Sequence, residues 1–186
     1  MKKLLVVPIA LLFFACGHNR GPMANATIDS TSGSTAKGTV HFQDAGENGV
    51  EVVVDLTGVP PGVHGFHVHE KGDCGNNAQN AGGHFNPGGM VHGAPDAVSH
   101  HAGDFGNVTA DEKGEVHTRF DTHSISINTG TNAVVGHALV LHGNPDDLVS
   151  QPAGNAGPRI GCGVVGLANA MASVNPPMTF ARRNTK

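Results

Sequence analysis

Seven of the 13 histidines of this chain lie between residues 64 and 104. His67 and His69 are separated by one residue in a strand-like stretch, so both imidazoles should point to the same face of a strand. His84, His92 and His101 follow among Gly, Asn and Pro, and Asp104 ends the stretch. This composition is typical of a loop that folds around a bound group. Imidazoles with one carboxylate suit zinc or copper better than calcium, which prefers oxygen ligands. The sequence therefore predicts a transition-metal site.

Short β-strands must position these residues, because no window shows a helical period of useful length. Turn signals such as Asn48-Gly49, Pro60-Pro61-Gly62 and Lys113-Gly114 separate the strand-like runs. The predicted strands are 25–31, 37–43, 50–57, 64–70, 105–110, 114–121, 134–141 and 160–167. Eight short antiparallel strands indicate an all-β barrel or sandwich. Two long loops, 71–104 and 142–159, would carry the chemistry.

Composition agrees with this class. The chain has 186 residues, 27 Gly, 11 Pro and neither Trp nor Tyr, which argues against a helical bundle and allows one domain with a real core. The formal net charge is −4. Loss of Lys2 and Lys3 with a leader would leave nine basic against 15 acidic residues, a charge of −6, which disfavours nucleic acid as a partner. An anionic substrate would have to be attracted by a local field.

Residues 1–16 are predicted to be a signal peptide. A charged start precedes an apolar run over 4–14, and Ala15-Cys16 ends it. This junction resembles the lipobox of bacterial lipoproteins, although Phe13 stands where Leu is usual, so we expect a lipid on Cys16 and a periplasmic or cell-envelope location. An ordinary secretory signal cut near Cys16 is the alternative. The expected order is then a tether at 17–24, a domain at 25–170 and a C-terminal tail at 171–186.

The cysteines fit an exported protein, in which disulfides persist. If Cys16 carries lipid, Cys74 and Cys162 remain as a pair, 88 positions apart. Closing a loop of that length should stabilise the fold by roughly 4–5 kcal/mol in the chain-entropy model. Two free thiols are the alternative.

Several motifs together resemble the copper/zinc superoxide dismutases. Gly65-Phe66-His67-Val68-His69-Glu70 and the run GNAGPRIGCGVV at 154–165 are similar to the two signatures of that family. Between them, HFNP at 84–87, GDFGNV at 103–108 and His142 followed by Asp146-Asp147-Leu148 occur in the family's order. The resemblance covers about residues 37–168. It implies an eight-stranded antiparallel Greek-key β-barrel with copper and zinc at one side.

The resemblance also implies the ligands. Copper would be held by His67, His69, His84 and His142, and zinc by His84, His92, His101 and Asp104. His84 would bridge the two metals, and only the family's register selects His101 over the adjacent His100. Asp146 would hydrogen-bond one ligand of each metal, His67 and His92. Such a zinc site is closed and structural, whereas copper ringed by nitrogens can alternate between +2 and +1.

Arg159 matches the family's loop arginine, which would attract and hydrogen-bond superoxide beside copper. The implied reaction is dismutation of superoxide to oxygen and hydrogen peroxide, with His84 supplying a proton in the reduced state. The loop 142–159 contains no Lys, so Lys71 is a candidate for steering the substrate. The oligomeric state is predicted to be monomer or homodimer, with membrane contact only through the N-terminal lipid.

The remaining histidines are not predicted to be ligands. His64 should tie a loop to the barrel. Four further histidines lie in or beside strands without a partner motif and should be solvated or hydrogen-bonded: His41, His117, His123 and His137. Two alternatives stay open for the whole chain. A copper-holding protein without turnover would typically lack a ligand or the loop arginine, and a structural zinc protein would leave His67, His69 and His142 unexplained.

Overall fold

The computed structural model describes residues 21–168. The expected signal peptide with Cys16, and all of the expected C-terminal tail at 171–186, lie outside these residues. Within them, no helix is long and apolar enough to cross a membrane. The elements are β1 (Met23–Ser30), β2 (Lys37–Asp44), β3 (Val50–Thr57), β4 (Gly62–His69), β5 (Asp104–Ala110), β6 (Val116–Thr122), β7 (Ala138–His142), β8 (Arg159–Val164) and β9 (Gly166–Leu167), with two short 3-10 helices at Gly46–Asn48 and Gln79–Ala81.

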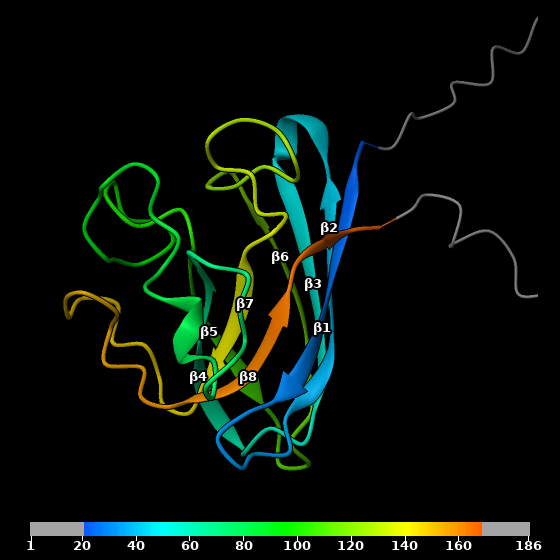
Figure 1. The fold of residues 1–186 in the computed structure, drawn as a ribbon, viewed down its shortest axis with the longest axis vertical. Helices are drawn as coiled ribbons and strands as arrows, with labels where there is room; N and C mark the ends of the chain where they lie inside the picture. Colours follow the sequence, from blue (N-terminus) through cyan, green and yellow to red (C-terminus); the bar gives the residue numbers. More distant parts are fainter. Residues whose placement is uncertain (1–20, 169–186) are drawn as a thin grey trace, which may run out of the picture.

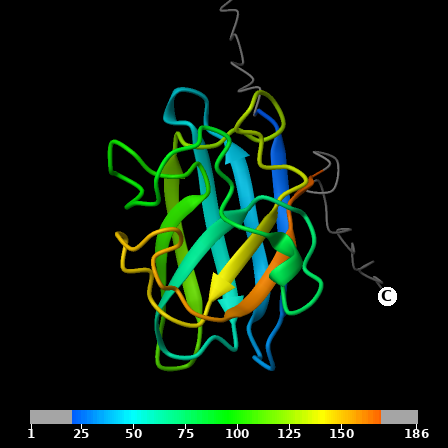
Figure 2. The ribbon, with the colours of Figure 1, turned by 60° about the vertical axis from the view of Figure 1, so that its left-hand side comes forward.

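The strands form one curled antiparallel sheet in the order β5-β4-β7-β8-β1-β2-β3-β6, with the two-residue β9 added beside β1. After β1, β2 and β3 the chain crosses to β4, and β6 then returns to pair with β3, which is a Greek-key connection. Figures 1 and 2 show the resulting barrel. Phe105 of β5 and Phe120 of β6 pack across its seam, with ring centroids 5.4 Å apart. The predicted eight-stranded all-β barrel is confirmed.

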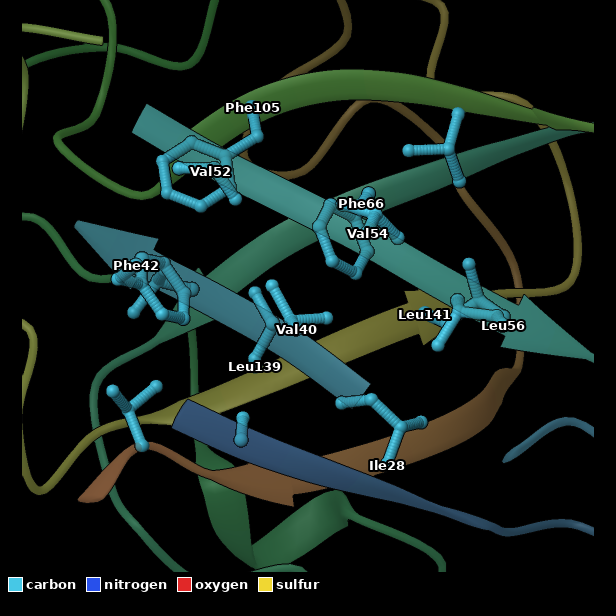
Figure 3. Packing of buried hydrophobic residues seen from close by; sticks show 14 of the residues in the cluster. Ile28, Val40, Phe42, Val52, Val54, Leu56, Phe66, Phe105, Leu139 and Leu141 are labelled. Carbon is cyan, nitrogen blue, oxygen red and sulfur yellow. The ribbon is translucent and has the colours of Figure 1, made fainter. Parts of the chain in front are cut away.

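Strand alternation builds the core between the two halves of the barrel. In β2 and β3 every second side chain points inward, which buries Val40 and Phe42 from one strand and Val52 and Val54 from the other. They meet residues of β4 and β7 from the opposite wall, including Phe66 (Figure 3). Period-two burial of β-branched and aromatic residues thus explains why these segments become strands.

The strands β4 and β7 differ from β2 and β3 because their outer faces are buried as well as their inner faces. Phe66, Val68, Leu139 and Leu141 point into the core. The alternate residues point outward and lie beneath the loops 71–104 and 142–159, which cover one side of the barrel in both views (Figures 1 and 2). Val140 and Ala138 pack there against Ala78, Ala81 and the cysteine Cys162 in a small second cluster. This covered outer face is where the histidines gather.

Two predicted strand ranges were too long. The strand expected at 134–141 begins at Ala138, because residues 134–137 form a turn closed by the amide of His137 on the carbonyl of Val134, with Gly136 in the left-handed region at φ +92°. The strand expected at 160–167 is divided at Val165: β8 pairs with β7 and with the end of β1, whereas β9 pairs with the start of β1. β1 begins at Met23, inside the segment expected to be a tether.

Candidate metal centre

The first group of candidate ligands stands on the outer face of β4 and β7. His67 and His69 alternate with the core residues Phe66 and Val68, so their imidazoles project to the side opposite the core. His142 ends β7, at an irregularity in its pairing with β8. His84 comes from the loop after β4, where a bridge to His69 holds its backbone. All four side chains are buried.

These four imidazoles converge. Their candidate ligand nitrogens lie within 4.8 Å of one another, and Nε2 of His69 is 3.3 Å from Nε2 of His142. The ring of His84 packs on that of His67, with centroids 4.1 Å apart. Four nitrogens with a common focus are a copper-type donor set.

A second group surrounds the carboxylate of Asp104 at the start of β5. The Nδ1 atoms of His84, His92 and His101 lie 2.7, 3.1 and 3.2 Å from its oxygens. The group is buried, and its candidate ligand atoms again lie within 4.8 Å of one another. Three imidazoles and one carboxylate form a closed zinc-type set. His84 belongs to both groups and so joins them.

Four buried ring nitrogens of these groups have no hydrogen-bond partner in the described part of the chain: Nδ1 of His67, Nε2 of His84, Nδ1 of His92 and Nδ1 of His101. A buried polar atom left without a partner costs about 1–3 kcal/mol. Proteins seldom leave several such atoms together, and one cation bound in each group would satisfy them. The residues present therefore fit two metal ions.

Burial also keeps the imidazoles ready to bind metal. Desolvation, assisted by neighbouring histidines, holds the pKa of His67 and His69 well below the usual value. Desolvation lowers the pKa of His142 to about 4 and that of His101 below its usual range. For Asp104 burial opposes ionisation, but hydrogen bonds from His84 and the amide of His101 outweigh it and lower the carboxyl pKa. Neutral rings and an ionised carboxylate are the protonation states that bind metal.

Asp146 connects the two groups from the loop 142–159. Its Oδ2 accepts a hydrogen bond from Nε2 of His67 at 2.9 Å, and its Oδ1 accepts from Nε2 of His92 at 3.0 Å. Both contacts expected of Asp146 are present. Because each ring donates through Nε2, its Nδ1 keeps the lone pair that a metal needs.

Glycine at position 154 makes this approach possible. A Cβ added there would lie 1.7 Å from Oδ1 of Asp146 and 2.7 Å from Nε2 of His92, and the residue has φ +62°. Both the space and the left-handed backbone exclude a side chain. This explains the glycine at the start of the second signature.

Arg159 lies at the edge of a pocket of about 490 Å³ that is also lined by His69, His84 and His142. Its guanidinium donates to the carbonyls of Ala78 and Gly82 at 2.5 and 2.6 Å. Five N–H groups are available to an arginine, so donors remain for a ligand in the pocket. The arginine is half-buried and lies where an anion can reach both it and the first group.

The predicted disulfide is present. Cys74 and Cys162 are joined, with their Cα atoms 5.8 Å apart. The bond attaches the loop that carries Ala78 and Gly82 to β8, the strand that begins with Arg159. The loop carbonyls that hold the guanidinium are therefore tied to the strand that presents it.

The other histidines lie outside both groups. The ring nitrogens of His64 face the carbonyls of His142 and Pro60 at 2.8 and 2.7 Å, which ties the loop to the barrel as expected. The remaining contacts are His41 with Asn25, His117 with Asp55, His137 with the carbonyl of Glu70, and His100 with the carbonyl of His101. Lys71 is exposed and lies 3.7 Å from Glu70, so its steering role stays a prediction.

Two amide side chains near the site were not anticipated. Asn107 pairs with the backbone of Asp146 through both its oxygen and its nitrogen, at 2.8 and 2.9 Å. Gln151 pairs with the backbone of His92 in the same way, at 2.8 Å for each bond. Asn107 lies in a quoted motif and could have been singled out there. Gln151 could not, because its partner is 59 residues away and no spacing links them.

Fold and site together define a β-barrel protein with two adjoining groups of candidate metal ligands that share one histidine. The family model for copper/zinc superoxide dismutase matches residues 36–165. The chain belongs to the copper/zinc superoxide dismutase family. It is a superoxide dismutase that uses copper and zinc.

Proposed function

We propose that this protein dismutates superoxide to oxygen and hydrogen peroxide at a copper ion that shares His84 with a zinc ion, outside the cytoplasm. The membership of His84 in both groups carries the proposal, because one imidazole would then serve as a ligand for both ions. Copper would be held by His67, His69, His84 and His142. Zinc would be held by His84, His92, His101 and Asp104.

Copper supplies one-electron oxidation and reduction when it is bound. The protein's part is to keep the four imidazoles in place and, by burying them, to exclude other ligands. Asp146 orients His67 and His92 through their Nε2 protons. His84 lines the pocket, and its Nε2 has no hydrogen-bond partner among residues 21–168. We expect a proton to be held at this atom and passed to reduced superoxide.

Arg159 would attract the anion and orient it. Its charge is permanent, and its plane is fixed by two carbonyls, so little side-chain entropy is lost when a small anion binds. The local positive charge opposes the formal charge of −4 of the whole chain. Electrostatic attraction of this kind raises association rates by about 10- to 1,000-fold.

The test is a metal-dependent assay of the purified protein. Metal-free protein is loaded with zinc, with copper and with both, and bound metal is counted by mass spectrometry alongside cyanide-sensitive superoxide turnover. We expect one copper and one zinc per chain, with rapid turnover only when copper is present. His117→Ala, a change at an exposed histidine outside the site, serves as the matched control.

A copper-holding protein without turnover is the competing function. It would bind both metals in full and show negligible dismutation. Arg159 favours the enzyme, because a copper carrier has no need of a fixed cation beside an accessible pocket.

We also propose export and lipid attachment at Cys16. The leader sequence and the disulfide between Cys74 and Cys162 support an oxidising compartment outside the cytoplasm. The intact mass of the mature protein and the fractionation of Cys16→Ser test this: the lipid mass and membrane association should both disappear in the variant. Sedimentation of the soluble variant would distinguish the monomer from the homodimer.

A further inference from the structure

The side chain of Gln151 makes a two-point contact with the backbone of His92. Its Oε1 accepts the amide proton of His92, and its Nε2 donates to the carbonyl of the same residue, both at 2.8 Å. The Nε2 group also donates to the carbonyl of Val149 at 3.2 Å. The amide therefore attaches one peptide segment of the loop 71–104 to the loop 142–159.

Two bonds to one residue restrict its backbone more than either bond alone. A single bond would let the peptide of His92 rotate about the contact, whereas an acceptor and a donor together fix its orientation. The ring is held separately, by Asp146 on Nε2. With both ends of the residue fixed, Nδ1 can point only to the carboxylate of Asp104, 3.1 Å away.

Gln151 also belongs to the wall of the pocket. Together with Pro152, Ala153 and Asn155 it lines the same pocket as the candidate ligands His69, His84 and His142. One side chain thus contacts the backbone of a candidate zinc ligand and the surface past which superoxide must move. Asp146 and Gln151 both link the loop 142–159 to His92. Asp146 contacts the imidazole ring of His92, and Gln151 contacts its backbone.

We propose that Gln151 is a positioning residue for zinc, which holds the backbone of His92 so that zinc is retained and the pocket wall is ordered. The proposal rests on the assignment of His92 to zinc made above. It is not a catalytic role, because Gln151 acts through His92. Since coupling between sites is reciprocal, zinc should in turn order the segment around Gln151.

The experiment compares Gln151→Met with wild type. Methionine has a similar length and volume but lacks the amide. Gln79→Met is the matched control, because Gln79 lines the same pocket from the loop closed by the disulfide and is not bonded to His92. Zinc dissociation into a chelator, copper affinity, and hydrogen exchange of residues 149–153 with and without zinc are measured on the full mature chain.

Removal of a supporting contact around a metal ligand typically costs 10- to 100-fold in metal affinity. We expect Gln151→Met to release zinc about tenfold faster, with copper affinity unchanged and with most of the zinc-dependent protection of residues 149–153 lost. Gln79→Met should behave as wild type. Gln151→Asn, too short by one methylene to reach both groups, should show the same faster release and is the variant to use if the methionine protein does not fold.

Wild-type zinc release in Gln151→Met, or equal losses of stability with and without zinc, would overturn the proposal and leave Gln151 as a structural link only. Failure of the wild-type protein to bind zinc would instead contradict the assignment of the site itself. The two failures are distinguishable because only the second is visible before any substitution is made.

Discussion

His69 and Arg159 donate hydrogen bonds to the same acceptor, the carbonyl oxygen of Gly82, at 3.0 and 2.6 Å. One is a candidate copper ligand and the other is the cation beside the pocket. Because His69 donates through Nδ1, its Nε2 keeps the lone pair that faces His142. A single carbonyl therefore sets both the tautomer of a ligand and the position of the guanidinium.

This arrangement predicts different effects for two substitutions of Arg159. Arg159→Ala removes both charge and anchoring, and kcat/KM for superoxide should fall by about tenfold or more. Arg159→Lys keeps the charge but cannot make two parallel bonds to Ala78 and Gly82, so it should restore only part of the loss. Pulse radiolysis at several ionic strengths would measure this, and equal rates for all three proteins would contradict it.

Loss of the disulfide should affect stability and the pocket together. Replacing Cys74 and Cys162 by Ser should lower the free energy of unfolding by roughly 4–5 kcal/mol, because the closed loop is long. The loop that presents Gly82 is then released from β8, so turnover should fall as well. Urea unfolding and activity of the double variant would check both effects, with reductant-treated wild type as the comparison.

Asp146→Asn should weaken zinc binding by about 10- to 100-fold. An amide has one acceptor and one donor in place of two acceptors, so it cannot accept from both His67 and His92. Chelator competition measures the loss. Asp121→Asn, an exposed change on β6, should retain zinc as wild type does.

The metal-free protein should lose stability as the pH falls below about 6.5. The pKa of His142 in the folded protein is lowered to about 4, and burial also lowers the pKa of His67 and His69. Between these values and the unfolded value, the unfolded chain binds more protons, so each such group subtracts about 1.4 kcal/mol per pH unit. Urea unfolding at pH 7 and pH 4.5 tests this, and His142→Gln should reduce the slope.

The pKa of His117 should be shifted upward, opposite to the pKa values of the buried histidines. Its hydrogen bond with Asp55, together with the charges of Asp55 and Glu115, raises the pKa of this exposed histidine. The small stabilisation it provides is present below the unfolded pKa and is lost as the pH rises through the folded one. NMR titration should show a raised pKa that Asp55→Asn returns toward the usual value. An unchanged pKa in the variant would exclude the pair as the cause.

Much of the fold followed from local pattern. Alternation in β2 and β3 and the turn at Asn48-Gly49 depend on neighbouring residues, so the sequence shows them directly. The start of β7 at Ala138 was missed because the turn at 134–137 is held not only by its own bond between His137 and Val134 but also by backbone hydrogen bonds with Val165, which lies between β8 and β9. Tertiary contacts of this kind have no local signal.

The site residues also divide into those that the sequence could predict and those that it could not. His67-Val68-His69 is visible as a pair on one face, and family motifs select His84 and Asp146. The choice of His101 over His100 came from register alone, and the structure shows its cause: Nδ1 of His100 is bonded to the carbonyl of His101, while Nδ1 of His101 faces Asp104. Contacts between loops, such as that of Gln151 with His92, were beyond any pattern along the chain.

The position of β1 has a consequence for a lipid-anchored form. Its C-terminal end pairs with β8, where Ser30 faces Gly161 near Arg159, and its first residue, Met23, lies at the other end of an eight-residue strand. Only six residues separate Cys16 from Met23, roughly 25 Å of chain at full extension. A lipid on Cys16 would thus hold the barrel close to the bilayer by the end of β1 that lies away from Arg159 and the pocket it lines.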